Sequence, residues 1–517
     1  MEATHLQSIR RDGTKESIWQ TAEKQSITTN SSLTGKDIFD VIIIGGGITG
    51  ITTALNLQRE GKKCLLIEAK NLGFGTTGGT SAHLNTFFDA TYPEIDSDFG
   101  KDASKLIAVA GKRMILAIKG NIDSLGIHAD FSFRDGYLFS QDEKETKQLK
   151  EILASSVEAG TEVEEADTNG VGIAFDYSVK FSNQAEFHPL KYINGLARAF
   201  EALGGQILEN TFVSDTKFLD GIHQVKAADK SFSARNIVWA THIPPGINIL
   251  SLRNAPYRSY VLAVQLSDGN YPACLSYDMK EPYHYFRTHK IEDQKYLLVG
   301  GEDHKTGHDD PERAFAALET YVRQNFAVDS IGYNWSSQYY VPVDGLPYIG
   351  KLPGAEENIY VATGFNGNGM IFGTLSAEIL TDLILNRQNE LSELLSPSRL
   401  KPVAGFTEFV KENADVAYHF VADRFNNEAL ETLDKLPKNE GQIAKFDGEQ
   451  LAIYKDGDGK ISALSPVCTH AGCIVSWNTT EKSWDCPCHG GRFSVDGAVL
   501  TGPPRAALKK VNLTKNS

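Results

Sequence analysis

Long hydrophobic runs are missing from this sequence of 517 residues: no stretch of 18 apolar residues occurs, which argues against a membrane-spanning helix. Basic residues are also fewer than acidic ones. There are 51 Lys and Arg against 66 Asp and Glu, and the formal net charge of −15 argues against a nucleic acid as partner. Residues 1–36 are polar and lack the apolar core of a secretory signal peptide. We therefore expect a cytoplasmic protein without a membrane span.

Cysteine is scarce as well, and six residues are too few to make a disulfide scaffold of a chain this long. Cys64 and Cys274 stand alone in apolar surroundings, which predicts buried thiols. The other four gather in two stretches, 468–473 (C-T-H-A-G-C) and 486–491 (C-P-C-H-G-G). Each stretch offers one thiolate and one imidazole, so together they could bind zinc or the [2Fe–2S] cluster of a Rieske centre. The ligands would be Cys468, His470, Cys486 and His489.

The spacings Cys-x-His and Cys-x-x-His resemble those of the Rieske family, and within it the disulfide-bearing branch of the cytochrome bc complexes. The resemblance covers residues 438–517. It implies that the two cysteine ligands bind one iron, that the two histidines bind the other, and that Cys473 and Cys488 form a disulfide. Residues 502–504 (G-P-P) resemble the proline loop that shields such clusters. A structural zinc ribbon is the alternative, but it would not need the second pair of cysteines.

Two departures from that branch concern the potential of the cluster. Its members carry a Ser and a Tyr whose hydroxyls donate hydrogen bonds to the cluster sulfurs and so raise the potential. Gly491 and Phe493 stand at those positions here. The resemblance therefore implies a potential in the lower part of the Rieske range of roughly −150 to +300 mV.

A second motif lies near the N-terminus. Residues 40–44 are a short apolar run typical of a buried parallel strand, residues 45–50 match G-x-G-x-x-G, and residues 51–60 predict a helix that ends at Gly61. A second strand at 63–67 leads to an acid. This order is typical of a dinucleotide site, in which the helix N-terminus faces the pyrophosphate. The residues expected to act there are Gly45 in the turn, Gly47 against the pyrophosphate, Gly50 between helix and strand, and Glu68 on the ribose hydroxyls.

Three later segments, at 195–213, at 234–242 and at 342–350 with 359–369, resemble parts of the D-amino-acid-oxidase-like family of flavoproteins, which includes glycine and sarcosine oxidases. The resemblance spans about residues 40–390. The resemblance implies FAD as cofactor. Residues 71–85, rich in Gly, Ser and Thr, are expected to form a flexible loop against the flavin ring. A late Gly-rich turn opens a helix predicted at 370–385, whose N-terminus can face the flavin pyrimidine. Further FAD contacts are implied at Val213, Thr241, Gly364, Phe365 and Gly367, with His242 where Gly is commoner.

The resulting fold class is an α/β FAD-binding Rossmann-type domain with an α+β substrate domain, plus a small all-β Rieske domain. Residues 1–36 would be an N-terminal extension, 37–390 the FAD-dependent oxidoreductase, 391–437 a linker with a helix at 406–426, and 438–517 the Rieske domain. Within the oxidoreductase, the FAD-binding parts would be about 37–88, 190–246 and 339–390. The substrate domain would be about 89–189 and 247–338.

The substrate is less defined by the sequence. Members similar to sarcosine oxidase hold the substrate carboxylate with Arg residues in the loop matching 81–85 and with a Lys after the late Gly-rich turn. Here the loop reads S-A-H-L-N and Ile371 stands at the late position, so Arg258 or Arg287 would have to replace those groups. His83 is a candidate base, a candidate covalent flavin anchor, or a structural histidine. Further pocket candidates are Tyr257, His284, Tyr339 and Tyr340.

A flavin accepts two electrons as a hydride, whereas a Rieske cluster passes one electron at a time. The presence of a flavin and a cluster on one chain favours a dehydrogenase that oxidises a small organic molecule, such as an amine or amino-acid derivative. Electrons would pass from FAD through the cluster to an external acceptor: a ferredoxin, a cytochrome or a quinone. Two alternatives stay open, an electron-transfer or reductase module that oxidises no organic substrate, and an O₂-using oxidase with a structural cluster.

Overall fold

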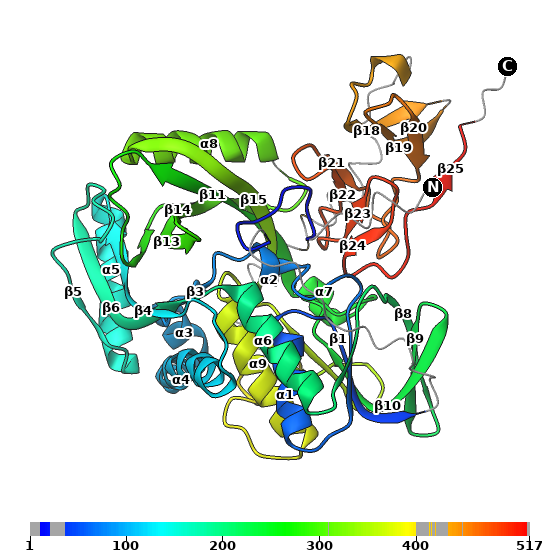
Figure 1. The fold of residues 1–517 in the computed structure, drawn as a ribbon, viewed down its shortest axis with the longest axis horizontal. Coiled ribbons are helices and arrows are strands. Elements are labelled where there is room, and N and C mark those ends of the chain that lie inside the picture. The colour runs from blue at the N-terminus through cyan, green and yellow to red at the C-terminus, as the bar shows by residue number, and fades with distance from the viewer. Residues whose placement is uncertain are drawn as a thin grey trace.

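The computed structural model describes residues 11–20, 37–308, 310–399, 433–446 and 448–513, together with Asn413, Asp415 and His419. The chain forms two large sheets and two small ones, with the small sheets beside one edge of the larger part (Figure 1). The predicted fold class is confirmed: an α/β dinucleotide-binding part, a second α+β part and a small all-β domain. The helix predicted at 406–426 lies outside the described residues.

The first large sheet carries the dinucleotide motif. Its strand order is β16-β17-β10-β1-β2-β7, and the strands from β17 to β7 are parallel. Strand β1 is buried on both faces, because Val41 and Ile43 face one hydrophobic cluster while Ile42 and Ile44 face another. The strands are β1 (Ile38–Ile44), β2 (Cys64–Ile67), β7 (Gln206–Leu208), β10 (Lys230–Trp239), β16 (Tyr348–Lys351) and β17 (Ile359–Thr363), and the hairpin β8 (Val213–Leu219) and β9 (Ile222–Ala227) joins β10.

Three helices gather on one face of this sheet (Figure 1): α1 (Ile48–Arg59), α6 (Pro189–Ala202) and α9 (Gly369–Ile384). Helix α1 starts directly after the Gly-rich turn and ends where Gly61, with φ of 77°, reverses the chain. Helices α1 and α9 therefore both present their N-termini at the carboxyl edge of the parallel strands. That edge is where ligands of open α/β sheets bind.

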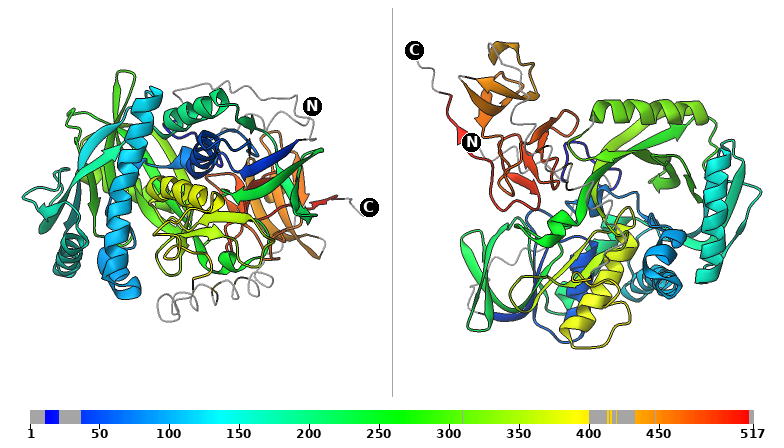
Figure 2. Two further views of the ribbon diagram at one scale, coloured as in Figure 1. Left: turned by 90° about the horizontal axis from the view of Figure 1, so that it is seen from below. Right: turned by 180° about the vertical axis from the view of Figure 1, so that it is seen from behind.

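The second large sheet faces that edge. Its order is β15-β11-β14-β13-β12-β4-β6-β3, with β5 beside β6. Helix α8 (Pro311–Asn325) covers β11 and β14, while α3 (Tyr92–Phe99), α4 (Lys101–Leu125) and α5 (Glu143–Ala159) lie near β3 to β6 (Figure 2). The strands are β3 (His83–Leu84), β4 (Ser132–Ser140), β5 (Val163–Glu165), β6 (Tyr177–Glu186), β11 (Asn254–Leu266), β12 (Leu275–Asp278), β13 (Tyr285–Ile291), β14 (Gln294–Lys305) and β15 (Val328–Pro342).

Residues 71–85 differ from the predicted flexible loop. They contain the short helix α2 (Thr76–Gly79) and strand β3, and the side chain of Thr77 accepts a hydrogen bond from the backbone N–H of Ile48 at 3.1 Å. The Ser17 hydroxyl donates to the carbonyl of Gly78 at 2.6 Å. A Cβ atom on Gly78 would lie 2.3 Å from the carbonyl oxygen of Gly73, and one on Gly79 would lie 2.6 Å from Ser337 Oγ, so these two glycines allow close packing.

The predicted N-terminal extension contributes residues 11–20 to the interior. Ile18 and Trp19 are buried, and the Trp19 indole N–H donates to the carbonyl of Thr80 at 2.6 Å. The segment runs between β15 and the C-terminal domain, as the dark blue loop in Figures 1 and 2 shows. It is therefore part of the folded oxidoreductase.

The C-terminal domain consists of two four-stranded antiparallel sheets, β18-β19-β20-β25 and β21-β22-β23-β24. The two Cys/His stretches are the loops that precede β21 and β23. The strands are β18 (Glu440–Phe446), β19 (Glu449–Lys455), β20 (Ile461–Leu464), β21 (Ser476–Asn478), β22 (Ser483–Asp485), β23 (Arg492–Ser494), β24 (Val499–Thr501) and β25 (Lys510–Val511), after a short 3₁₀ turn at Leu433–Lys435 and with the short helix α7 (Ile249–Leu252) of the larger part nearby.

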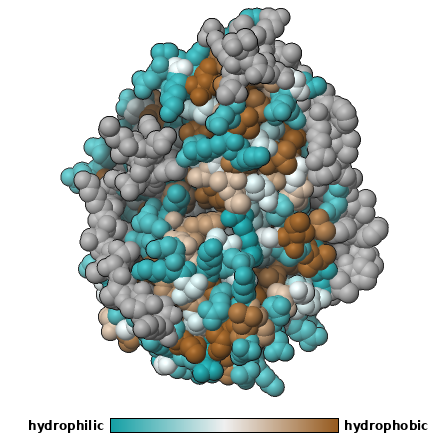
Figure 3. All heavy atoms as spheres, turned by 90° about the vertical axis from the view of Figure 1, so that its right-hand side faces the viewer, coloured by the Kyte–Doolittle hydropathy of each residue, from teal (hydrophilic) through white to brown (hydrophobic). Residues whose placement is uncertain are grey.

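On the side of the molecule that includes the C-terminal domain, apolar side chains form several separate groups among hydrophilic ones (Figure 3). Among the helices that the structure describes, none is both long and apolar enough to cross a membrane.

Candidate functional site

The turn between β1 and α1 has the geometry of a phosphate-binding loop. Gly45 has φ of 112°, and a Cβ atom on it would lie 2.3 Å from the carbonyl oxygen of Ala240. A Cβ atom on Gly50 would lie 1.9 Å from the carbonyl oxygen of Gly45, so only glycine lets α1 pack this closely on the turn. Gly47 is the N-cap of α1 and lines an open cavity. The helix N-terminus thus offers backbone N–H groups to a phosphate.

Glu68 stands at the end of β2 and also lines this cavity. Its carboxylate accepts hydrogen bonds from the backbone N–H groups of Gly46 at 2.7 Å and Lys70 at 2.8 Å. Burial raises the pKa of Glu68 more strongly than these hydrogen bonds lower it. The carboxylate therefore orders the Gly-rich turn as well as facing the space predicted for a ribose.

The cavity continues from this turn along the edge of the first sheet and into the second sheet. Of the residues predicted to bind FAD, Gly50 and Gly364 lie behind its wall. The others line it: Gly45, Gly47, Glu68, Val213, Thr241, Phe365 and Gly367.

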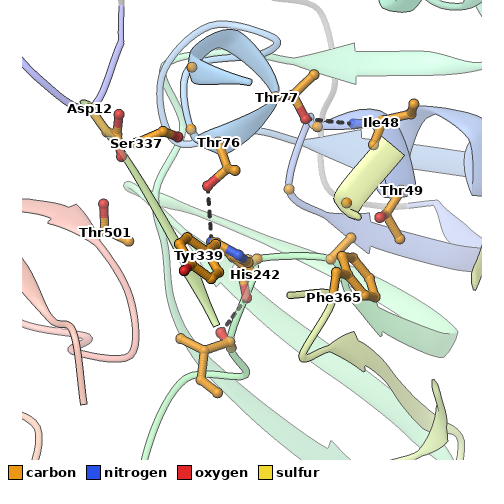
Figure 4. A pocket seen from close by; sticks show the side chains of 18 of the residues that line it. Asp12, Ile48, Thr49, Thr76, Thr77, His242, Ser337, Tyr339, Phe365 and Thr501 are labelled. Atoms are coloured by element: carbon orange, nitrogen blue, oxygen red, sulfur yellow. Dashed lines mark hydrogen bonds between the residues drawn. The ribbon is translucent and has the colours of Figure 1, made fainter. Parts of the chain in front are cut away.

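The middle of the cavity is built from α2 and His242, together with Asp12 of segment 11–20 and Thr501 of the C-terminal domain (Figure 4). The Thr76 hydroxyl donates to the carbonyl of Gln338 at 2.7 Å, so His242 Nδ1, 3.1 Å away, must be the donor of the second hydrogen bond. Burial lowers the pKa of His242 to about 4, which keeps the ring neutral. Asp12 and Thr501 lie on the side of the pocket opposite Phe365 (Figure 4).

The far end of the cavity, within the second sheet, is lined by four tyrosines, two acids and a histidine. We call this set the tyrosine pocket: Tyr277, Tyr283, Tyr285, Tyr339, Asp89, Asp303 and His83. Tyr339 donates to Asp303 Oδ2 at 2.8 Å, and Tyr283 donates to Asp89 Oδ1 at 3.3 Å. Burial raises the pKa of Asp303 to about 7.

Apart from Tyr339 and His83, the sequence analysis did not single out these residues. One signal was present, since the alternation Tyr283-His284-Tyr285 puts two tyrosines on one side of an extended chain and His284 on the other. The acids gave no such signal, because Asp89 and Asp303 come from distant parts of the chain.

His83 lies in the tyrosine pocket and is nine-tenths buried, with 8% of its surface exposed. Its Nδ1 is hydrogen-bonded to the Tyr277 hydroxyl, and its Nε2 has no partner. Burial holds the pKa of His83 well below its ordinary value, so the ring is neutral. A neutral imidazole with one free nitrogen can exchange a hydrogen bond or a proton with a ligand.

Arg258 and Arg287, the predicted carboxylate-binding residues, do not line the cavity. Arg258, on β11, is buried against the C-terminal domain, where it donates to Ser336 Oγ at 2.7 Å and lies 3.8 Å from Glu481. Arg287 donates to the carbonyls of Ser81 and Ala82 at 2.9 Å. Both guanidinium groups are thus used inside the fold. Tyr257, His284 and Tyr340 also lie off the cavity wall.

The Cys/His loops of the C-terminal domain bring four buried or half-buried ligand groups together. The thiols of Cys468 and Cys486 are hydrogen-bonded to each other, and the rings of His470 and His489 lie 4.9 Å apart. The Nδ1 atoms of both rings are buried without a partner. His470 donates through Nε2 to the carbonyl of Gly246 at 3.2 Å, which leaves a lone pair on Nδ1 for a metal. The donors therefore fit two irons with two thiolates and two imidazoles.

Cys473 and Cys488 form a disulfide between the two loops, as the resemblance implied. It stands beside the four ligands in one buried cluster. All four cysteines of these loops are thus accounted for, two in the disulfide and two as free thiols.

The ligand loops dock directly on the wall of the flavoprotein part. The Tyr340 hydroxyl donates to the carbonyl of His489 at 3.1 Å, and Gln338 donates to the carbonyl of Gly490 at 2.9 Å. Gly490 has φ of 69°, and a Cβ atom there would lie 2.6 Å from Pro256. The Tyr340 ring lies 4.7 Å from that of His242, which lines the cavity. Residues 499–502, 504 and 505 of the C-terminal domain line the same cavity.

Comparison with known proteins agrees with this architecture. Residues 40–383 match the family described as FAD dependent oxidoreductase, and residues 429–512 match the Rieske [2Fe-2S] domain. A Rieske 2Fe-2S iron-sulfur protein of Bacillus subtilis (strain 168), YhfW, is 32% identical over 92% of this chain and 93% of its own.

Two further likenesses cover the flavoprotein part alone. Gamma-glutamylputrescine oxidoreductase of Escherichia coli (strain K12) is 23% identical over 69% of this chain and 85% of its own. The crystal structure of glycine oxidase from Geobacillus kaustophilus has a TM-score of 0.59 at 17% identity, covering 70% of this chain and 99% of that one. This structural likeness supports the fold.

Proposed function

Because the chain belongs to the FAD dependent oxidoreductase family and ends in a Rieske [2Fe-2S] domain, we propose that it is a dehydrogenase for a small organic molecule. The substrate is an amine or amino-acid derivative, and its electrons leave through the cluster to an external acceptor. The name of the E. coli relative, gamma-glutamylputrescine oxidoreductase, supports an amine.

The two groups divide the chemistry. FAD supplies two-electron oxidation when bound, and the [2Fe–2S] cluster supplies one-electron steps to an acceptor. In this proposal the turn at Gly45 to Gly47 and Glu68 hold the dinucleotide, and Val213, Thr241, Phe365 and Gly367 complete its wall. Cys468 and Cys486 bind one iron, while His470 and His489 bind the other.

The observation that carries the proposal is the position of the cluster loops. The His470 ring donates to the carbonyl of Gly246, and the backbone carbonyl of His489 accepts from Tyr340, so both ligand loops lie against the flavoprotein wall. A cluster held by these loops would lie beside that wall. His242, Tyr340 and His489 form a short contiguous route from the cavity to the cluster loop. A cluster that only stabilised the fold would not need this contact with the FAD site.

The test is anaerobic addition of a substrate that bleaches the flavin, followed by electron paramagnetic resonance of the frozen sample. We expect the signal of the reduced [2Fe–2S] cluster to appear after the flavin is reduced. In Cys486→Ser, which removes a ligand, the flavin should still bleach while turnover with a one-electron acceptor falls sharply.

Cys274→Ser is the matched control, because Cys274 is a buried thiol in the other part of the molecule. FAD content must be measured for both variants, since the C-terminal domain lines the FAD cavity. Wild-type turnover in a cluster-free Cys486→Ser that retains FAD would contradict the proposal. Equal turnover with O₂ alone would favour an oxidase instead.

A further inference from the structure

The tyrosine pocket has an unusual charge balance for a site that would take an amino acid. It contains two acids, and the only Lys and Arg side chains on the cavity wall, among the residues that the structure describes, are Lys70 and Arg505. Lys70 follows Glu68 at the dinucleotide end, and Arg505 lies 5.7 Å from the Trp239 ring. A substrate carboxylate in the tyrosine pocket would therefore find no cation on the wall.

Asp303 is the central acid of the pocket. Its Oδ2 accepts from the Tyr339 hydroxyl at 2.8 Å, and its Oδ1 is buried without a hydrogen-bond partner. A carboxylate oxygen left without a partner is costly to bury unless a ligand supplies a donor or a positive charge. Asp89 stands beside it, held by the backbone N–H of Gly367 at 2.6 Å, and its side chain is open to the cavity.

The aromatic walls add to this preference. The ring centres of Tyr277, Tyr283 and Tyr285 lie 6.1–6.3 Å from one another. The electron-rich faces of such rings attract ammonium groups, most strongly where water is excluded. The hydroxyls remain neutral, because burial and the nearby acids hold the pKa values of Tyr283 and Tyr339 well above their ordinary value.

The remaining polar groups agree with a cationic ligand. His83 lines the pocket and is neutral, and its Nε2 is buried without a partner. With Nδ1–H donating to the Tyr277 oxygen, Nε2 can accept a hydrogen bond from an ammonium N–H. Arg287, which lies behind this wall, is paired with Glu186 at 3.3 Å and with backbone carbonyls. Its charge is thus paired with Glu186, although it still helps to lower the pKa of His83.

We propose that the tyrosine pocket binds the substrate as an ammonium ion, with Asp303 as its counter-ion, and that the substrate carries no carboxylate on the carbon that is oxidised. The inference rests on the proposed function and narrows its substrate to amines. Asp303 would accept the ammonium proton, and FAD, when bound, would supply the two-electron oxidation by taking a hydride from the α-carbon. Water would then hydrolyse the resulting iminium ion to a carbonyl compound and an ammonium ion. The two electrons leave with the hydride.

Two pairs of probes test, on the holoenzyme, whether the tyrosine pocket prefers an ammonium group to a carboxylate. Pentylamine and norleucine differ only in the α-carboxylate, and anaerobic flavin bleaching compares them as reductants. Pentyltrimethylammonium and hexanoate carry opposite fixed charges on similar chains, and neither can be oxidised as an amine. Calorimetry therefore measures their binding without chemistry. We expect pentylamine to bleach the flavin faster than norleucine, and only the ammonium to bind.

Asp303→Asn should weaken pentyltrimethylammonium binding by at least about tenfold, because the counter-ion is lost while the shape is kept. Glu302→Gln is the matched control, since Glu302 is the neighbouring acid on β14, faces His284 and lies off the cavity wall. It should change binding by less than about twofold. Tyr339→Phe removes only the hydrogen bond to Asp303, and it replaces Asp303→Asn as the test variant if that protein does not fold. It should alter the affinity for pentyltrimethylammonium in the same assay.

Three results would overturn the inference: norleucine bleaching the flavin faster than pentylamine, hexanoate binding as tightly as the ammonium, or an ammonium that either fails to bind the wild type or binds the Asp303 and Tyr339 variants as tightly as the wild type. Failure of the proposed function looks different. In that case the ammonium still binds, but the cluster stays oxidised when the flavin is reduced.

Discussion

Asp303 makes ligand binding depend on pH in a defined direction. Burial raises its pKa to about 7, while the nearby hydroxyls of Ser259 and Tyr339 and the charge of His284 lower it and Asp89 raises it further. Below this pH the carboxyl group is neutral, and above it the carboxylate attracts a cation. We therefore expect the affinity for pentyltrimethylammonium to rise as the pH passes upward through about 7.

The probe is suited to this test because its own charge does not titrate. Calorimetry at a series of pH values gives the profile, and Asp303→Asn should flatten it. A wild-type affinity that stays constant across this range, or falls as pH rises, would contradict the assignment of Asp303 as counter-ion.

Because Gly491 and Phe493 lack hydroxyl groups, we expect the cluster to have a low potential. Phe493 is fully buried, and it has no hydroxyl to donate to a ligand sulfur. Phe493→Tyr should raise the potential of the cluster, because a donated hydrogen bond stabilises the more negative reduced state. Gly491→Ser is a poorer test, since a Cβ atom at 491 would lie 2.7 Å from the Pro504 ring.

Film voltammetry measures both proteins on the same electrode. The wild type should fall in the lower part of the Rieske range of roughly −150 to +300 mV, with the tyrosine variant above it. A wild-type potential near the top of that range would refute the role given to the missing hydroxyls, and so would a tyrosine variant that keeps its cluster but shows no shift.

The residues differ in how far the sequence could predict them. The ligands of the C-terminal domain follow from local spacing, since each Cys/His pair lies within four positions of chain. Asp303 and Asp89 gave no signal, because their partners come from other strands and loops. Arg258 was a reasonable candidate for a carboxylate, but Glu481, which lies 3.8 Å from it, belongs to the C-terminal domain.

At the scale of elements, segment 11–20 shows how a polar-looking stretch becomes structural. Trp19 is buried against the rings of His188 and His289 and below the guanidinium group of Arg287. Trp19→Ala should destabilise the protein by about 3–5 kcal/mol, because it leaves a large cavity and an unsatisfied carbonyl at Thr80. Chemical unfolding of the holoenzyme, followed by flavin fluorescence, measures this loss.

Glu16→Ala is the control for that measurement, because Glu16 is exposed in the same segment and its removal should change stability by less than about 0.5 kcal/mol. Equal effects of the two substitutions would mean that the segment is not an integral part of the fold.

The sequence predicted β1, α1 and β2 closely because their pattern is local. It did not predict α2, because the short helix depends on Ser17, which lies 61 positions before Gly78.

At the scale of the whole molecule, buried charges join three parts of the chain. Arg492 lies 3.2 Å from Asp12 and 3.0 Å from Asp485, and Glu481 lies 3.5 Å from Arg11. The partners come from segment 11–20 and the C-terminal domain, and Arg11 also donates to the carbonyl of Ser336 in β15 at 2.5 Å. Parting the C-terminal domain from segment 11–20 would break the Arg492–Asp12 and Glu481–Arg11 pairs together and expose this buried contact to water. The docked arrangement is therefore expected to persist through the catalytic cycle.

A fixed dock makes a kinetic prediction for electron transfer. If the cluster loops stay against Gln338 and Tyr340, transfer from flavin to cluster involves no domain rotation, and its rate should not change when glycerol raises the viscosity or when salt is added. Stopped-flow mixing of reduced substrate with the oxidised holoenzyme follows the step by the cluster absorbance. Turnover with a protein acceptor is the internal control, since that encounter is diffusive and should slow with viscosity and respond to salt. A flavin-to-cluster rate that falls in proportion to viscosity would instead require the C-terminal domain to undock and move.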